Sequence, residues 1–259
     1  MKTEELKEIA EKLVAGEKNA ALTGAGVSTE SGIPDFRSHG GLWEKYDPME
    51  YATIDAFRRD PEKVWVMIKD MNALLEDAEP NPAHTGLARL EELGVLAGIV
   101  TQNIDNLHQE GGSKNVIEFH GNGRRLVCLK CNAAQDAEKA RANWDKEFPP
   151  RCPECGYILK PDVVFFGEPI PPQASARAME LAQGVSVLLV VGTSATVAPA
   201  SYIPMVARKT GAAIVEINIE NTVLSEGFAD YTLLGKAGET LPILIEAVEA
   251  VLDKKGGLT

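Results

Sequence analysis

Short apolar runs recur along the chain, and segments with helical spacing of apolar residues lie between most of them. Continuous runs of Val, Ile and Leu are typical of strands that are buried on both faces. Such runs occupy residues 19–23, 95–101, 115–121, 162–167, 186–192 and 212–219. Helical spacing predicts helices over residues 83–94, 172–184, 199–211 and 239–254, and an N-terminal helix that ends at Gly16. The alternation predicts an α/β fold with a doubly wound, mostly parallel sheet.

Two long segments interrupt this alternation. Residues 41–83 carry several aromatic side chains and a helix-like run over 61–76, whereas residues 122–160 hold all four cysteines and few large apolar side chains. We expect these two insertions to fold against each other as a smaller domain. The larger domain then comprises residues 1–40, 84–121 and 161–259.

Composition narrows the class of protein. A chain of 259 residues with 44% hydrophobic content can bury a substantial core. Its net charge of -12 and its lack of a long basic block make nucleic acids and anionic membranes poor partners. The acidic N-terminus has no apolar signal region, and the longest apolar run is far shorter than the roughly 20 residues that span a bilayer. We expect a soluble, cytoplasmic protein.

The cysteines form two Cys-x2-Cys pairs, Cys128 with Cys131 and Cys152 with Cys155, separated by twenty residues. Each short spacing allows a tight turn to direct both thiolates at one ion, and two such turns complete a tetrahedron. Four thiolates leave no position for water or substrate, so the pattern predicts a structural zinc ion. The alternative is a redox pair or disulfides, which the paired motifs and a cytosolic setting disfavour.

The stretch after the first predicted strand contains Gly24-Ala25-Gly26. It resembles the first turn of a dinucleotide-binding fold, in which missing side chains let phosphates approach backbone N–H groups. The third glycine of that fingerprint is absent, because Thr29 takes its place, so an ordinary tight turn remains the alternative. The chain then continues through Asp35-Phe36-Arg37 rather than to an acidic residue at the end of a second strand.

Further polar stretches follow the other predicted strands, where open α/β sheets bind ligands. They cover residues 101–108, 119–121, 192–194 and 217–220. Most isolated histidines are structural, which is our interpretation of His39 and His84. His120 lies between an apolar strand and a glycine, where a neutral imidazole is suited to act as a general base near pH 7.

Taken together, these motifs resemble those of the sirtuins, the NAD-dependent protein lysine deacylases. The matching stretches are GAGVSTESGIPDFR, TQNIDNLH, HG, the two Cys-x2-Cys pairs, VVFFGE, GTS and IN, in the family's order. The resemblance implies a Rossmann-like domain joined to a smaller domain built from a helical insertion, residues 41–83, and a zinc module, residues 122–160. It also implies that NAD is consumed as a co-substrate.

The resemblance assigns roles by position. It assigns NAD binding to Gly24, Ala25, Gly26, Asp35, Phe36, Arg37, Gln102, Asn103, Ile104, Asp105, Gly192, Thr193, Ser194, Asn218, Glu220 and Ala237. It makes His120 the catalytic base and adds Asn103 to the catalytic residues. It assigns substrate binding to Val164, Phe165, Gly167 and Glu168. In the implied reaction nicotinamide leaves, the acyl group moves to ADP-ribose, and free lysine is released.

Family members that remove acidic acyl groups carry a Tyr and an Arg, three residues apart, in the helical insertion. The corresponding positions here are Ile68 and Met71, although Lys69 is close by, so we expect acetyl or longer apolar acyl groups to be preferred. Two other functions remain open: mono-ADP-ribosyl transfer from the same NAD pocket, and an NAD-sensing, zinc-containing binding module. We expect acyl-lysine peptides or proteins as partners, and a monomer.

Overall fold

The computed structural model describes residues 3–35 and 41–256. The chain divides into two compact units, each built from separate stretches of sequence. The first unit comprises Met1–Asp35, Ala78–Phe119 and Pro172–Thr259, and the second comprises Phe36–Asp77 and His120–Pro171. The boundaries differ from those expected: residues 78–83 join the first unit, and residues 120–121 and 161–171 join the second.

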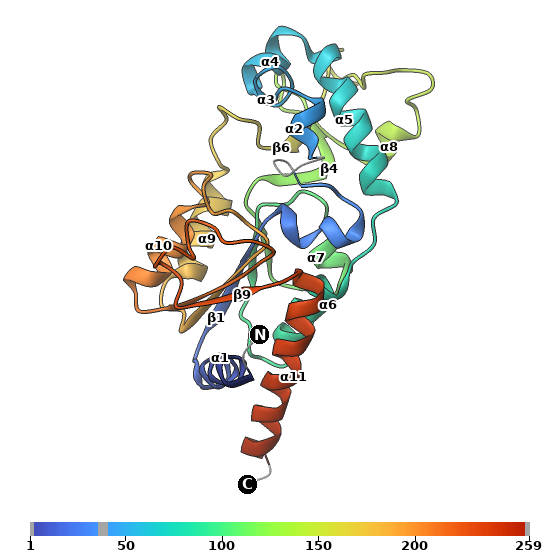
Figure 1. Cartoon of the computed structure of the whole chain (residues 1–259). Coiled ribbons are helices and arrows are strands. Elements are labelled where there is room, and N and C mark those ends of the chain that lie inside the picture. The colour runs from blue at the N-terminus through green and yellow to red at the C-terminus, as the bar shows by residue number, and fades with distance from the viewer. Residues whose placement is uncertain (1–2, 36–40, 257–259) are drawn as a thin grey trace. The chain divides into compact units, whose positions relative to one another are not determined.

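A six-stranded parallel sheet forms the centre of the first unit, in the order β3-β2-β1-β7-β8-β9. Figure 1 labels two of its strands, β1 and β9. Its strands are β1 Asn19–Thr23, β2 Ile99–Thr101, β3 Val116–Glu118, β7 Val187–Val191, β8 Ala213–Asn218 and β9 Tyr231–Leu234. This order runs outward in both directions from β1 and β7, which is the arrangement of a doubly wound, Rossmann-like sheet. The fold class predicted from the sequence is therefore confirmed.

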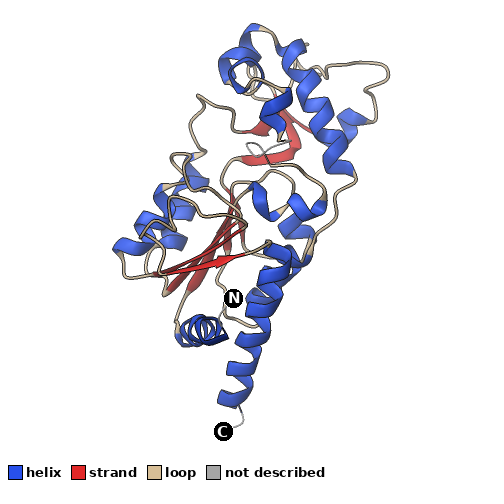
Figure 2. Cartoon of the chain, in the orientation of Figure 1, coloured by secondary structure: helices blue, strands red, loops and turns tan. Residues whose placement is uncertain are grey.

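Helices cover both faces of this sheet (Figure 2). The helices α1 Thr3–Ala15, α6 Pro82–Glu92 and α11 Ala237–Gly256 pack together in the main core, with Val187, Leu189 and Val191 of β7 beneath them. Leu188 and Val190 alternate with these residues and are equally buried, so they face the other side. The helices α9 Pro172–Ala182 and α10 Tyr202–Lys209 contact each other and the sheet. Short helices η1 Ala25–Val27, η2 Thr29–Ser31 and α7 Leu107–Glu110 follow β1 and β2.

The second unit combines short helices with a three-stranded antiparallel sheet in the order β5-β4-β6. Its elements are α2 Leu42–Lys45, α3 Pro48–Tyr51, α4 Ile54–Arg59, α5 Pro61–Glu76, β4 Gly121–Val127, β5 Ala134–Asp136, α8 Ala137–Arg141 and β6 Lys160–Val163. Trp65 of α5 lies at its centre, with no exposed surface, and its Nε1–H donates to the Leu159 carbonyl oxygen at 2.8 Å. The rings of Trp144 and Phe148 pack edge-on against Trp65.

One predicted strand was wrong. The run at 162–167 belongs to the second unit, where only its first residues extend β6, which pairs with β4 and not with the parallel sheet. The sixth parallel strand is β9, which was not predicted because its burial is mixed and it lacks a long apolar run. The other strands and helices agree with the predictions to within a few residues. Among the described helices, none combines the length and the apolar character needed to cross a bilayer.

Candidate functional site

The glycine turn lies against the end of the neighbouring strand β7. Gly24 N–H donates to the Val191 carbonyl oxygen at 3.1 Å, and Gly26 N–H donates to that of Gly192 at 2.9 Å. A methyl group on Gly26 would lie 2.9 Å from the Gly192 Cα atom, and one on Gly24 would lie 2.7 Å from the Thr193 Cβ atom. The glycines are therefore needed for packing as well as for an open backbone. Because β1 and β7 flank the switch point of the sheet, this is where the fold binds ligands.

A hydrogen-bonded cluster of four side chains lies beyond β1 and β2. Ser28 Oγ donates to Asp105 Oδ2 at 2.7 Å and accepts from Asn103 Nδ2 at 3.0 Å. His84 Nε2 lies 3.3 Å from the same hydroxyl oxygen. Ser28 thus uses its one proton on the carboxylate and both lone pairs on the other partners. The structure brings the predicted residues Asn103 and Asp105 together through a serine that the sequence analysis did not single out.

His84 has a defined tautomer in this cluster. Asn81 N–H donates to His84 Nδ1 at 3.2 Å, so in the neutral ring the proton is on Nε2 and points to Ser28. His84 has no exposed surface, and burial lowers its pKa to about 4 although the charge of Asp105 opposes that shift. His84 therefore both caps α6 and holds the Ser28 hydroxyl in place. The spacing of Asn81 and His84, a capping box that begins α6, was the signal available in the sequence.

His108 lies behind His84, with the ring centroids 4.9 Å apart. Thr23 Oγ1 donates to Thr101 Oγ1 at 2.9 Å, and it accepts from His108 Nε2 at the same distance. His108 Nδ1 is buried without a hydrogen-bond partner among the described residues. Burial and the neighbouring His84 lower the pKa of His108 to about 3. Both rings are therefore neutral at physiological pH.

A second polar group surrounds Thr193, directly after β7. Gln102 Nε2 donates to Thr193 Oγ1 at 2.9 Å, and Asn218 Nδ2 donates to the Thr193 carbonyl oxygen at 3.2 Å. Three predicted NAD contacts from three different strand ends are thus joined here. Ser194 is exposed and its hydroxyl bonds to that of Thr196 at 3.0 Å.

The remaining predicted NAD contacts differ in their exposure. Asp35, Ile104 and Ala25 are half-buried, Glu220 is exposed, and Ala237 is buried at the first residue of α11. Phe36 and Arg37 lie outside the described residues.

In the second unit, His120 is half-buried and precedes β4 directly. Val164 N–H donates to the His120 carbonyl oxygen at 2.8 Å. Gly121 has a φ of +78°, and a methyl group there would lie 2.2 Å from the Asp162 carbonyl oxygen. Only glycine fits at this position, which explains the HG pair and holds His120 beside β6.

The predicted substrate-binding stretch divides into inward and outward residues. Phe165 is only 7% exposed and packs edge-on against Phe57, so its ring lies in the core of the second unit. The next residue, Phe166, is 44% exposed. Because side chains two residues apart in an extended segment point to the same side, Phe166 and half-buried Val164 lie on one side of the chain. Gly167 is exposed with a φ of +87°, and the Glu168 carboxylate turns back to accept from Phe165 N–H at 2.8 Å.

The four cysteine sulfur atoms lie within 4.8 Å of one another. Cys128 and Cys155 have their Sγ atoms 3.5 Å apart, as do Cys131 and Cys152, much farther than the roughly 2.05 Å of a disulfide. Tetrahedral zinc with bonds of about 2.3 Å requires sulfur separations of about 3.8 Å. All four residues are free thiols, so they fit one tetrahedral ion.

Both cysteine turns have the same construction. Asn132 N–H donates to the Cys128 carbonyl oxygen, and Gly156 N–H donates to that of Cys152, each at 2.9 Å. Asn132 and Gly156 both have positive φ angles, 61° and 72°. Two equivalent turns that direct four sulfur atoms to one point are typical of a closed, structural metal site.

Comparisons with known proteins agree with this geometry. The Sir2 family model matches residues 24–199. NAD-dependent protein deacylase 2 of Pyrobaculum aerophilum is 46% identical over 251 residues, which cover 97% of this chain and 99% of that protein. A solved complex of a Sir2 homologue with NAD is 44% identical with a TM-score of 0.87, covering 95% of this chain and 94% of the other. A structure of Sir2 with a p53 peptide and NAD+ is 34% identical with a TM-score of 0.86, and the match covers 100% of both chains.

Proposed function

This chain belongs to the Sir2 family, as its motifs predicted, and we propose that it is an NAD-dependent protein lysine deacylase that releases nicotinamide and O-acyl-ADP-ribose. The observation that carries the proposal is the cluster of Ser28, Asn103 and Asp105 beyond the carboxyl ends of β1 and β2. It presents an amide and a carboxylate, both already oriented, at the switch point of a dinucleotide-type sheet.

Each predicted site residue would have a separate role in NAD binding or in the reaction. The open backbone at Gly24 and Gly26 would receive the NAD phosphates, with Thr193 and Ser194 beside them. Asn103 and Asp105 would form the nicotinamide site, Gln102 would contact the adjoining ribose, and Asn218 the adenosine ribose. His120 would act as the base that takes a proton from a ribose hydroxyl, so that the hydroxyl attacks the carbon of the acyl group.

The acyl pocket would be apolar. Val164 and Phe166 would contact the acyl-lysine side chain, and Ile68 and Met71 carry no charge to pair with an acidic acyl group. Lys69 lies nearby in sequence, but its Nζ atom is 5.2 Å from the centre of the Phe148 ring. Acetyl and longer apolar chains should therefore be removed faster than succinyl.

Three further properties belong to this proposal. The four cysteines would hold one structural zinc ion, which would stabilise the second unit. The protein would be a monomer located in the cytoplasm. Metal analysis after exhaustive dialysis tests for the zinc ion, and sedimentation of the purified chain tests for the monomer. Imaging in the source cells tests the location.

The decisive experiment is a product analysis. The protein and its His120→Ala variant are incubated with NAD and an acetyl-lysine peptide, and all products are followed by mass spectrometry. Equal amounts of deacetylated peptide, nicotinamide and acetyl-ADP-ribose, lost in the variant, are expected. ADP-ribose attached to protein would instead indicate transferase activity, and no turnover with acetyl, myristoyl or succinyl peptides would favour a binding module. A higher kcat/KM for succinyl than for acetyl peptide would refute the apolar pocket.

A further inference from the structure

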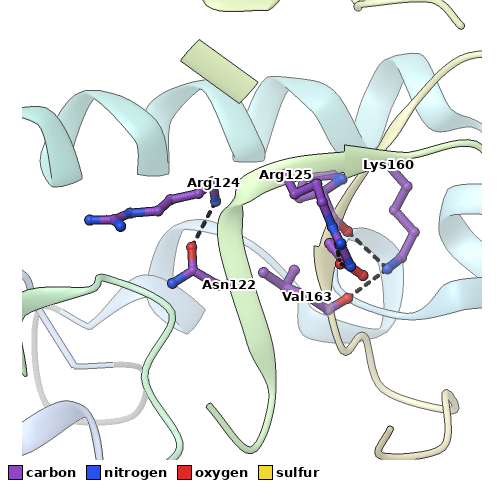
Figure 3. Close-up of polar contacts among 7 residues, drawn as sticks. Asn122, Arg124, Arg125, Lys160 and Val163 are labelled. Atoms are coloured by element: carbon purple, nitrogen blue, oxygen red, sulfur yellow. Dashed lines mark hydrogen bonds and ion pairs between the residues drawn. The ribbon is translucent and has the colours of Figure 1, made fainter. Parts of the chain in front are cut away.

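A buried lysine lies directly beneath the stretch proposed to bind the substrate. Lys160, the first residue of β6, has a side chain that is only 3% exposed. Figure 3 shows its side chain directed at the carbonyl oxygen of Val163. The neighbouring acid, Asp162, is engaged elsewhere, because Arg125 Nε donates to its Oδ2 atom at 2.8 Å.

All three ammonium protons of Lys160 have acceptors. Lys160 Nζ donates to the carbonyl oxygens of Pro161 at 3.1 Å and Val163 at 2.6 Å, and it pairs with Glu168 Oε2 at 2.9 Å. The same nitrogen lies 4.4 Å from the centre of the Phe165 ring, a cation–π contact. The ammonium group thus binds both ends of the segment 163–168 and the ring between them.

Such a pair is not explained by stability alone. The desolvation free energy of two buried charges is about as large as the free energy gained from their attraction, so apolar residues of similar size would stabilise the fold equally well. The bonds of Lys160 instead define geometry. They hold two backbone carbonyls and one carboxylate in fixed positions, and that carboxylate also accepts from Phe165 N–H.

One peptide group connects this arrangement to the proposed base. The carbonyl oxygen of Val163 accepts from Lys160, and the N–H of the same peptide group, on Val164, donates to the His120 carbonyl oxygen at 2.8 Å. Lys160 therefore fixes one end of a peptide plane whose other end holds the His120 backbone. With Phe165 held inward, Val164 and Phe166 are left on the opposite side of the chain.

We propose that Lys160, paired with Glu168, is a positioning residue for the acyl-lysine substrate, acting through residues 163–168 and the backbone of His120. This inference rests on the proposed function, since it assumes that Val164 and Phe166 contact the acyl chain. Lys160 itself does not touch the reacting groups.

The test compares Lys160→Met with wild type and with Lys63→Met. Lys63 is a lysine of the same unit with a side chain that is 38% exposed, and the substitution removes a comparable ion pair, with Glu50 at 2.6 Å. We expect Lys160→Met to lower kcat/KM for an acetyl-lysine peptide at least tenfold and to change KM for NAD less than twofold. Lys63→Met should change neither. Backbone hydrogen exchange of residues 163–168 should rise at least tenfold in Lys160→Met only.

The outcomes separate this inference from the proposed function. Unchanged exchange over residues 163–168, or equal losses for NAD and peptide, would overturn the positioning role. If wild-type protein deacylates no peptide, the proposed function fails, and the exchange measurement still decides whether Lys160 holds the segment. Should Lys160→Met fail to fold, Glu168→Gln takes its place, because it removes the charge and keeps hydrogen-bonding atoms. A smaller rise in peptide KM and in exchange is then expected, and no change in either would overturn the inference.

Discussion

The two buried histidines make the first unit sensitive to mild acid. His84 and His108 both have folded pKa values, about 4 and about 3, well below the ordinary value of 6.5. Protonation of His84 at Nδ1 would place a proton against the Asn81 N–H, and protonation of His108 would bury an unpaired N–H. The neutral forms therefore belong to the folded state. Their stabilising contribution is complete above pH 6.5 and is lost as the pH falls toward the folded values.

The size of the effect follows from these values. Between pH 7.5 and pH 5.0 a histidine that titrates at 6.5 unfolded and near 4 folded loses about 2 kcal/mol of stabilisation. His108 contributes a similar amount, so the free energy of unfolding should fall by about 4 kcal/mol if the two groups act independently. Most carboxylates remain ionised throughout this range, which isolates the histidines.

Urea denaturation at pH 7.5, 6.0 and 5.0 measures this loss. The signal should be circular dichroism, because the three tryptophans, Trp43, Trp65 and Trp144, all lie in the second unit and their fluorescence reports on that unit. The variant His84→Gln removes one titrating group, so its loss between pH 7.5 and 5.0 should be about half that of wild type. If wild type loses less than about 1 kcal/mol, or if the variant loses as much as wild type, burial does not control these groups.

Three further perturbations test other parts of the structure. Gly192→Ala places a methyl group 2.4 Å from the Val27 nitrogen, whereas the control Gly94→Ala, at a similar positive φ, meets nothing within 4 Å. Urea denaturation should therefore show Gly192→Ala to be less stable than Gly94→Ala by more than about 2 kcal/mol. Cys152→Ser should reduce bound zinc from one ion per chain to below one-tenth by metal analysis, and retention of the ion would refute the tetrathiolate assignment. Trp65→Phe removes a buried hydrogen bond and leaves a cavity, so it should lower the free energy of unfolding of the second unit by about 2–3 kcal/mol. Denaturation should be followed by a signal other than tryptophan fluorescence, and an unchanged midpoint would contradict the prediction.

The parallel sheet and the cysteine cluster were predictable because their signals are local. A strand covered on both faces requires a continuous apolar run, as in β7, and a tetrathiolate site requires pairs such as Cys128 and Cys131 at fixed spacing. Neither inference depends on knowing which distant segment packs against which. The sequence did not predict β9, because this strand is half-exposed at the edge of the sheet, where apolar residues are not required along its whole length.

The errors arose where tertiary contacts decide. Residues 162–167 look like a buried strand, but the close approach of β6 to Gly121 draws them into a different sheet. Likewise, a run of two phenylalanines does not reveal which ring faces inward, and the buried Lys160 ammonium under Phe165 settles that choice. The importance of Ser28 and His84 depended on a contact between residues far apart in sequence.

The second unit links the proposed metal to the proposed base through a single strand. β4 is the whole of the chain between His120 and Cys128, so one end of the strand adjoins the histidine proposed as the base and the other adjoins the first cysteine. Residues at both ends of β4 pair with β6, which also carries Lys160. A closed tetrathiolate site takes no part in chemistry, yet loss of its ion would free the end of β4 at Cys128 and weaken the pairing that orients His120. Activity should therefore depend on the proposed metal, although that metal would not contact the substrate.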